Sequence, residues 1–329
     1  NLARVDYDGT ASSLLAEPMR TNLVTYSSDF TNWNQIANIT LIQNSTTSPS
    51  GENDGTKFLS TSTGAKVRAN FSAVSGTTYT FSVYCKNIDA TFIKLLAYDG
   101  ANEFNANLTS EVNTSTWTRI SFTFTAANTA TGQIQIARDL PNGESVYFWG
   151  AQLEAGTYAT SYIPNFGTAL GVTRVQDQYE KTGISNLINS EEGVLFVEMA
   201  ALSDDGTDRR ITLSDGSVSD QVIIGLSRFA SNINAEIHSG GVLQTSGWGG
   251  TGVTQTNNNK FAISWGSGTM KFYINGSPIS PQTGITSPIG LNSLKFSLGN
   301  DTLNMFAKVK QLQIFKTALT DPELVTLTT

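Results

Sequence analysis

The stretch FWGAQLEAGTYATSYIPNFGTALGVTR, residues 148–174, contains the transition on which the fold assignment depends. Its beginning continues a run, residues 146–153, in which apolar side chains recur at period two, as in a β-strand with one buried face. Its end, residues 165–171, is polar and contains glycine, and residues 175–189 are polar with weak periodicity. We therefore expect a strand, then a connection, and a domain boundary near residue 175.

Short runs with the same alternation recur along the whole chain, separated by Gly, Asn, Ser and Asp. They are residues 77–86, 92–98, 117–125 and 133–138 in the first half, and 194–199, 221–226, 261–265, 270–274, 293–298 and 308–315 in the second. A spacing of about ten residues is typical of sandwiches and jelly rolls. We predict an all-β protein with two β-sandwich or jelly-roll domains in tandem, residues 1–175 and 176–329.

Two local signals refine the second domain. Asn275-Gly276 follows alternating residues and indicates a two-residue hairpin turn, in which both central positions need positive φ. Thr320 is suited to a helix N-cap, Pro322 to the first turn, and Glu323 to the third position of a capping box. The sequence therefore predicts a hairpin and a short C-terminal helix of one or two turns.

The composition restricts the partners. Hydrophobic residues make up 39% of the chain, enough for two cores, but charged residues only 14%, well below the ~25% of an average globular protein. The net charge is −7 and the basic residues are scattered, so we expect no nucleic-acid partner. No apolar run of about 18 residues occurs, so we expect no membrane insertion. The chain begins at Asn1 rather than methionine, and we expect further residues to precede it.

The first half resembles a jelly-roll module that recurs in bacteriophage tail and neck fibre proteins. The module ends in GAQLE-x-G, ATSYIP and a short TR linker, which stand here within residues 150–174. Its opening motif, LLLEPxRTNL, is matched by Glu17, Pro18, Arg20, Thr21 and Asn22. The resemblance covers residues 6–175. It implies a virion surface protein with the architecture of a carbohydrate-binding module, without identifying a ligand.

The second half resembles the laminin-G-like, or concanavalin A-like, lectin fold. EEGVLFVEMAAL at residues 191–202 is similar to its opening strand. KFAISWGSGTMKFYINGSPI at residues 260–279 is similar to its central hairpin, and residues 307–327 to its closing strand and helix. The resemblance implies a lectin-like sandwich.

Catalytic chemistry is not indicated. The single histidine, His238, lies in NAEIHSGG, and we interpret it as an exposed residue beside a turn. Glycosidases of the concanavalin A-like fold carry paired carboxylates at E-x-D-x-x-E spacing, which does not occur here. Glu198 stands alone, and the adjacent Glu191 and Glu192 would point to opposite faces of a strand. The single cysteine, Cys85, lies on an apolar strand phase and is interpreted as a buried structural thiol. We expect a non-enzymatic protein.

Calcium is the one cofactor that the resemblance leaves open. Laminin-G-like modules bind it through loop oxygen atoms, and Asp204, Asp205 and Asp208 form an acidic loop. The closing strand departs from the calcium-binding version of the family. In that version an acidic residue often follows the first apolar position, whereas this chain has Lys310. Solvated turn aspartates are the alternative interpretation.

Carbohydrate recognition needs flat aromatic faces beside hydrogen-bonding groups. The non-core phases of four strands in the first half carry such residues. If these strands share a sheet, one outer face gathers Tyr84, Lys86, Lys94, Tyr98, Trp117, Arg119 and Gln135. Such a face suits a glycan, or else packs against a neighbouring subunit or a second layer of the jelly roll. Trp248 and Trp33, in loop-like contexts, are further glycan candidates, whereas Trp149 and Trp265 are expected in the core.

Together these observations predict a virion surface adhesion protein, part of a phage tail, neck or head fibre, that binds a host-surface polysaccharide or glycan. We expect contacts with other virion proteins and a homo-oligomer, with a trimer favoured. One alternative is a purely structural or decoration protein without glycan binding. Another is the accessory binding region of a polysaccharide-degrading enzyme.

Overall fold

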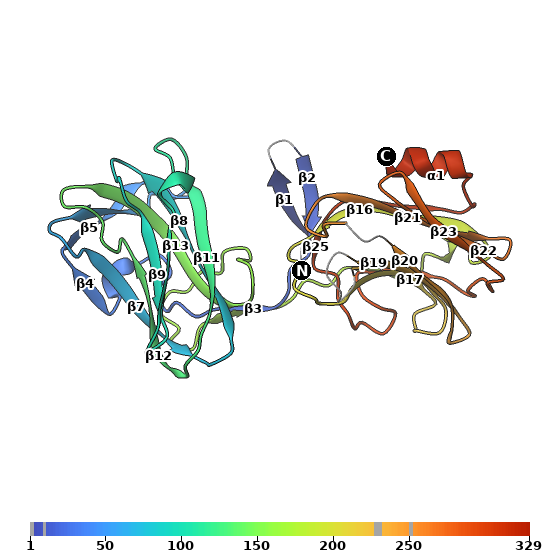
Figure 1. Ribbon diagram of the computed structural model, residues 1–329, viewed down its shortest axis with the longest axis horizontal. Helices are drawn as coiled ribbons and strands as arrows, with labels where there is room; N and C mark the ends of the chain where they lie inside the picture. Colours follow the sequence, from blue (N-terminus) through green and yellow to red (C-terminus); the bar gives the residue numbers. More distant parts are fainter. Residues whose placement is uncertain (1–2, 9–10, 227–231, 250–252) are drawn as a thin grey trace. The chain divides into compact units, whose positions relative to one another are not determined.

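The computed structural model describes residues 3–8, 11–226, 232–249 and 253–329. The chain divides into two compact units: Met19–Val175, here called the first sandwich, and Asn1–Pro18 together with Gln176–Thr329, here called the second sandwich. Each unit consists mainly of β-strands (Figure 1). The prediction of an all-β fold with two sandwiches is confirmed.

The first sandwich packs two five-stranded sheets face to face. One has the order β10 (Glu103–Asn107), β9 (Lys94–Tyr98), β12 (Ala130–Ile136), β7 (Lys66–Ala73), β4 (Gln35–Ala37). The other has the order β11 (Thr118–Thr125), β8 (Thr78–Asn87), β13 (Ser145–Ala155), β6 (Gly55–Ser60), β5 (Ile39–Thr46). The short strands β3 (Arg20–Asn22) and β14 (Val172–Arg174) pair with each other, and the 3-10 turns η1 (Phe30–Asn32) and η2 (Thr109–Glu111) complete the unit.

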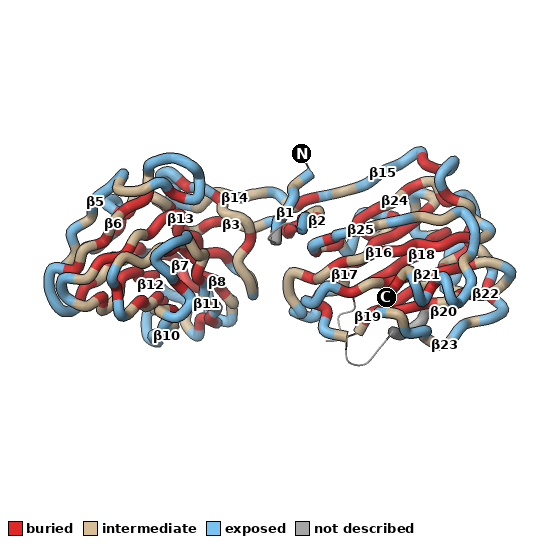
Figure 2. Tube along the Cα trace, turned by 90° about the horizontal axis from the view of Figure 1, so that it is seen from above, coloured by how far each residue is buried: buried red, intermediate tan, exposed pale blue. Residues whose placement is uncertain are grey.

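Alternation along these strands sends apolar side chains into one core between the two sheets. Phe58, Phe81 and Phe148 are fully buried there, and buried residues run along the strands of each unit in Figure 2. Cys85 belongs to this core, and burial raises the pKa of its thiol well above the ordinary value, as expected for a structural cysteine.

The second sandwich also has two sheets. The seven-stranded sheet has the order β1 (Arg4–Asp8), β2 (Ala11–Leu15), β25 (Ala307–Phe315), β16 (Gly193–Ala201), β21 (Asn259–Gly266), β22 (Thr269–Ile274), β23 (Ser277–Thr283). The six-stranded sheet has the order β15 (Glu180–Lys181), β24 (Ser293–Lys295), β17 (Arg209–Ser214), β18 (Gln221–Leu226), β19 (Ile233–Ser239), β20 (Val242–Gly249). A 3-10 turn, η3 (Ser185–Leu187), precedes β16. Trp265 is buried in the core between the sheets, as expected.

Residues 1–18 belong to the second sandwich, whereas the sequence placed them in the first domain. Strand β2 pairs with β25 through Leu14 and Val309, and Ala16 exchanges two backbone hydrogen bonds with Ala307 at 2.9 and 3.0 Å. Figure 1 shows β1 and β2, in blue, beside β25 of the C-terminal part of the chain. The reason is a pairing between segments some 300 residues apart (Leu14 with Val309), which local alternation cannot reveal. The units otherwise divide between Val175 and Gln176.

Both local signals of the second domain, the hairpin turn and the helix capping box, are confirmed. Asn275 and Gly276 have φ values of 48° and 77° and connect β22 to β23. The C-terminal helix α1 (Asp321–Thr328) begins after Thr320, whose backbone N–H donates to the Glu323 carboxylate at 2.8 Å. In the described ranges, no helix has the length and apolar character needed to cross a membrane.

Candidate functional site

A pocket lies on the outer face of the six-stranded sheet of the second sandwich, and we call it the β19 pocket. Alternation turns Val222 and Ile224 of β18 and Ile237 of β19 into the core, so the intervening residues face outward. The cavity has a volume of about 340 Å³. Its described lining consists of Arg210, Val218, Gln221, Ile223, Glu236, His238, Gly241, Leu298 and Leu303.

Three neighbouring strands bring polar side chains together in this pocket. Arg210 of β17 donates a hydrogen bond from Nη1 to Oδ1 of Asn234 at 3.0 Å. Asn234 Nδ2 donates to Oε1 of Glu236 at 2.5 Å, and Nε2 of His238 lies 3.3 Å from Oε2 of the same carboxylate. The guanidinium of Arg210 is 4.0 Å from Glu236 and 3.6 Å from Asp208. Each polar group is therefore held in position by another.

The electrostatics keep Glu236 ionised. Burial alone raises the pKa of its carboxyl, but the hydrogen bond with His238 and the charge of Arg210 outweigh burial, and the pKa lies below its ordinary value. Glu236 therefore presents carboxylate oxygens that only accept hydrogen bonds, beside the donors of Arg210 and the amide of Gln221. Ile223, fully buried, underlies the pocket, and the partly exposed Leu298 and Leu303 supply its apolar surface.

Sequence reasoning missed this site. His238 flanks a turn, as expected, but it is half-buried rather than exposed and lies beside Glu236. The alternation in NAEIHSGG already placed Asn234, Glu236 and His238 on one strand face. The strand that carries Arg210 could not be assigned as a neighbour from the sequence.

The glycan face expected in the first sandwich does not form as one surface, because its strands belong to different sheets. Tyr84, Lys86 and Arg119 lie on the outer face of the sheet that contains β8 and β11. Tyr98 and Gln135 lie on the outer face of the other sheet, on β9 and β12. Since the two sheets pack through their inner faces, these two groups are on opposite sides of the sandwich.

Two members of the expected face are covered by their own chain. Arg119 lies over the ring of Tyr84, 5.4 Å from its centroid, and donates to the carbonyl of Thr160 and to the hydroxyl of Ser82. Trp149 packs against Tyr84 and against Tyr162, with ring centroids 5.5 and 4.6 Å apart. The segment around Thr160 and Tyr162 thus covers this part of the sheet. Trp149 is buried beneath it, on the outer face rather than in the core that the sequence indicated.

One part of the same face is not covered by these contacts. It consists of Trp117, Tyr147, Lys57 and Lys86, and we call it the Trp117 row. Strand register places Tyr147 of β13 between Lys86 of β8 and Lys57 of β6. Trp117 stands immediately before β11, with its ring centroid 6.4 Å from that of Tyr147. The sequence identified Trp117 and Lys86, but missed Tyr147 and Lys57, which only strand pairing brings beside them.

The other tryptophan candidates differ from expectation. Trp33 is buried in the core, packs on Phe30 with ring centroids 5.2 Å apart, and donates from Nε1 to the carbonyl of Tyr26. It therefore presents no open face to a ligand. Trp248 belongs to strand β20, paired with Asn234, rather than to a loop tip. The side chain of Trp248 lies outside the described residues.

Two of the three calcium candidates lie beside arginines. Asp205 forms an ion pair with Arg209 at 2.5 Å, and Asp208 lies 3.6 Å from Arg210. Burial raises the pKa of the Asp205 carboxyl, and the charge of Arg209 more than reverses this, so the net shift is downward. Within the described ranges, no group of three or more His, Cys, Asp and Glu side chains is placed to hold a metal ion, and this includes Asp204.

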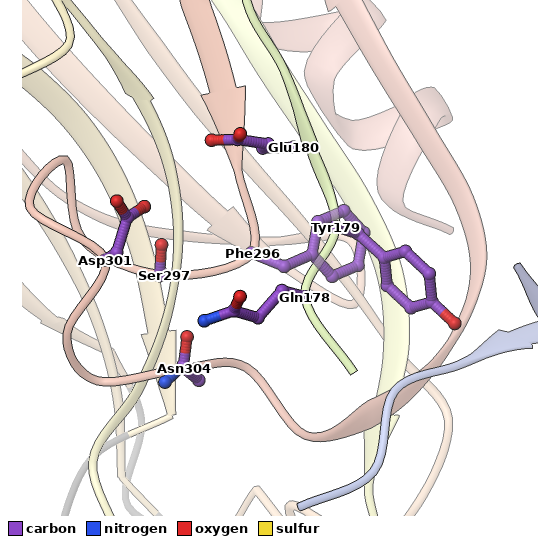
Figure 3. Close-up of a pocket in the computed structure, with 7 residues that line it drawn as sticks. All are labelled: Gln178, Tyr179, Glu180, Phe296, Ser297, Asp301 and Asn304. Atoms are coloured by element: carbon purple, nitrogen blue, oxygen red, sulfur yellow. The ribbon is translucent and has the colours of Figure 1, made fainter. Parts of the chain in front are cut away.

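A second pocket of the same sandwich, about 240 Å³ in volume, lies between β15 and the loop after β24 (Figure 3). Glu180 and Asp301 approach it, but the ammonium of Lys295 lies 3.6 and 2.7 Å from their carboxylates. The figure shows the hydroxyl of Tyr179 turned away from these residues, and it donates to the carbonyl of Leu15 at 3.0 Å. Both carboxylates are thus paired with the same lysine, and Tyr179 holds β2, so this pocket has a structural character.

Comparison with known proteins bears on the second sandwich. Residues 196–325 match the family model of the concanavalin A-like lectin/glucanases superfamily. This segment is less than half of the chain, and it contains the β19 pocket. Over these residues the second sandwich is similar to concanavalin A-like lectin domains, as the hairpin and closing motifs indicated. No curated protein matches the chain.

Several solved structures are similar at low identity. The CBM40 of a Ruminococcus gnavus sialidase, bound to α2,3-sialyllactose, is 14% identical, with a TM-score of 0.39 over 46% of this chain and 98% of that one. A heptameric pentraxin from Limulus polyphemus is 11% identical, with a TM-score of 0.39 over 46% and 76%. Domain 4 of an extracellular arabinanase from Geobacillus stearothermophilus, in complex with arabinotriose, is 16% identical, with a TM-score of 0.37 over 44% and 69%. Similarity at this level assigns neither a ligand nor an activity to this chain.

Proposed function

We propose that this protein is a non-enzymatic adhesion protein that binds glycan in the β19 pocket of its lectin-like domain. The observation that carries the proposal is the convergence of Arg210, Glu236 and His238 on the outer face of one sheet, around a cavity of about 340 Å³. A concave site with an apolar floor and a few fixed polar groups is the usual form of a small-molecule binding site.

The chemistry of the pocket suits sugar hydroxyl groups. A hydroxyl both donates and accepts hydrogen bonds, and the pocket offers an ionised carboxylate as acceptor beside a guanidinium and a carboxamide as donors. Because Glu236, Arg210 and Asn234 already hold one another, little side-chain freedom is lost when a ligand binds. The apolar side chains of Leu298 and Leu303 can contact the C–H surface of a pyranose ring.

The same geometry favours binding over hydrolysis. A glycosidase needs a carboxylic acid that holds its proton near neutral pH, opposite a second carboxylate. Glu236 has a lowered pKa, and it is the only carboxylate among the described residues that line the pocket.

A role at the surface of a phage virion, outside the cell, is supported by the resemblance of residues 150–174 to phage fibre modules. Fibres are usually symmetric oligomers, in which several weak sugar contacts add to firm adhesion. We expect a homo-oligomer, with a trimer favoured, in contact with other virion proteins. Sedimentation of the full chain and labelling of intact particles test these expectations.

A glycan array with the full chain tests the binding function. We expect a defined set of glycans to bind, and binding to fall about tenfold or more in Glu236→Gln and His238→Gln. The matched control is Glu191→Gln, an exposed glutamate of the same sandwich. An array without any bound glycan would favour the purely structural role. Binding that survives both pocket substitutions would place the site elsewhere.

A further inference from the structure

The first sandwich carries a surface whose chemistry differs from that of the β19 pocket. The Trp117 row combines two aromatic rings with two lysines on adjacent strands. Phe58 and Cys85 point into the core, so their neighbours Lys57 and Lys86 point outward on either side of Tyr147. Strands in a sheet lie about 4.8 Å apart, which places the two lysine backbones about 10 Å from each other.

The aromatic part of the row is held rigidly. Trp117 donates from Nε1 to the carbonyl of Thr47 at 2.9 Å, which fixes the indole from one edge. The six-membered ring of the Trp117 indole approaches Gly55 closely. A Cβ at position 55 would lie 3.1 Å from Cζ2 of Trp117 and 2.7 Å from Cγ2 of Thr46. Gly55 therefore leaves the space that the indole occupies. An indole fixed beside Tyr147 forms a preorganised aromatic surface, the form that the C–H face of a sugar ring requires.

The lysines give the row a positive charge that the neighbouring protein does not balance. Among the described residues, neither Lys57 nor Lys86 takes part in an ion pair, whereas Lys94 on the opposite sheet is paired with Asp139 at 3.2 Å. The carboxylate of Asp54 accepts a hydrogen bond from Nε1 of Trp149 at 2.8 Å and, among the described residues, forms no ion pair with either lysine. Lys57 and Lys86 are half-buried, and lysines in such positions commonly lay their stems along the sheet and extend their ammonium groups into solvent.

We propose that the Trp117 row is a second binding site, for a saccharide that carries a carboxylate or sulfate group. A pyranose ring stacks on Trp117, with Tyr147 inclined at 48° to the indole beside it, and its anionic substituent lies between the ammonium groups of Lys57 and Lys86. The site is in the other sandwich and does not depend on the function proposed for the β19 pocket. A nucleic acid is the other polyanion that stacks on aromatic side chains, but two lysines on a chain of net charge −7 do not form the basic groove that a phosphate backbone needs.

Calorimetric titration of the full chain with four probes tests the proposal. The probes are an oligogalacturonate, the same oligomer fully methyl-esterified, a sulfated galactose oligosaccharide and an oligothymidylate. We expect one or both anionic saccharides to bind at least tenfold more tightly than the neutral ester, and to bind less tightly as salt rises from about 0.05 to about 0.5 M. The two anionic probes show whether carboxylate or sulfate is the preferred group.

Substitutions then assign the binding to the row. Lys57→Gln and Lys86→Gln should each weaken binding of the anionic saccharide about three- to tenfold, without a change in melting temperature, because both ammonium groups are at the surface. The matched control is Lys66→Gln, a half-buried lysine on β7 of the opposite sheet, which should bind like the unaltered protein. Trp117→Phe should weaken binding while the fold is kept.

Four results would overturn the proposal: no binding of either anionic saccharide, equal binding of the neutral ester, tighter binding of oligothymidylate, or full affinity in both lysine variants. If Glu236→Gln were the only variant to lose binding of the acidic saccharide, that binding would belong to the β19 pocket. This result would also overturn the proposal. If, in contrast, the glycan array shows no binding that depends on Glu236, the titrations of the Trp117 row are unaffected. The two proposals can therefore fail separately.

Discussion

Oε2 of Glu236 lies 3.3 Å from Nε2 of His238, two positions further along strand β19. Residues separated by two positions share one face of a strand, so this pair is fixed by the strand itself. Arg210 of β17 approaches the same carboxylate from across the sheet. The pocket therefore combines a local relationship with a long-range one, and both have measurable consequences.

The Glu236 carboxyl should make folding sensitive to acid. Its pKa in the folded protein is below the ordinary value of 4.5, so the folded state keeps the carboxylate ionised at a pH where the unfolded chain takes up a proton. This contribution to stability is present above pH 4.5 and is lost as the pH falls through the folded-state pKa. Urea unfolding from about pH 6 to about pH 3 should show a shallower pH dependence for Glu236→Gln than for Glu191→Gln. Equal slopes would show that the network does not hold the carboxylate.

Asp99 should be essential to the first sandwich. It is buried, and its carboxylate accepts hydrogen bonds from the backbone N–H groups of Ala101, Asn102 and Ala127. Burial raises the pKa of Asp99, but these bonds outweigh burial and the pKa falls well below its ordinary value. Asp99→Asn puts amide hydrogens against N–H donors, so the melting temperature should fall clearly at pH 7. The difference should narrow as the pH drops below 3.8, where the unfolded chain takes up a proton on Asp99, and should keep narrowing as the pH falls toward the lower pKa of the folded state. An unchanged melting temperature at pH 7 would contradict this role.

Arg119 should stabilise the first sandwich rather than bind a ligand. Its guanidinium connects β11 to the segment at Thr160 and lies over Tyr84. Arg119→Ala removes hydrogen bonds of a charged donor and should lower the free energy of unfolding by about 2 kcal/mol. Chemical denaturation measures the loss, and hydrogen exchange should increase around Thr160. A fully stable variant with weakened saccharide binding would restore Arg119 as a binding residue.

Residues 1–18 should stabilise the second sandwich and not the first. In a chain that begins at Met19, β25 loses its partner β2, and Asp177 loses the N–H of Glu17, which donates to it at 2.8 Å. Amides of β25 should then exchange faster, while those of β8 keep their protection. Limited proteolysis tests the expected boundary in parallel, with cleavage between about 165 and 190 and two resistant fragments. Faster exchange in β8 would place residues 1–18 with the first sandwich.

Trp265 and Trp117 should respond differently to truncation. Trp265 is 1% exposed and donates from Nε1 to the carbonyl of Ser190 at 3.1 Å. Trp265→Ala leaves a large cavity in the second sandwich and should cost about 3–5 kcal/mol of unfolding free energy. Trp117 is only half-buried, so Trp117→Ala should cost clearly less. Equal costs would mean that the Trp117 ring is a packing element, and the second binding site would lose its platform.

The sequence alone determined the features that depend on neighbouring residues. Alternation at period two identified the strands and the side-chain phase of each, so Cys85 and Trp265 were correctly placed in a core. The Asn275-Gly276 turn and the capping box at Thr320 and Glu323 were predictable because their geometry is contained within a few residues. The similarity of the second half to concanavalin A-like lectin domains was recognisable from three such segments together.

Only the tertiary structure decided which strands are neighbours. Alternation at period two shows to which side of its strand a side chain points. It does not show which strand is the neighbour, or to which sheet the strand belongs. Tyr98 was therefore grouped with Trp117 although their strands belong to different sheets, and Tyr147 was missed although it stands next to Trp117. The contact between Arg210 and Glu236 was not predictable for the same reason, because it depends on which strands are neighbours. Each candidate site here is built across strands, and cross-strand pairing is set by packing of the whole sandwich, which no local stretch of sequence contains.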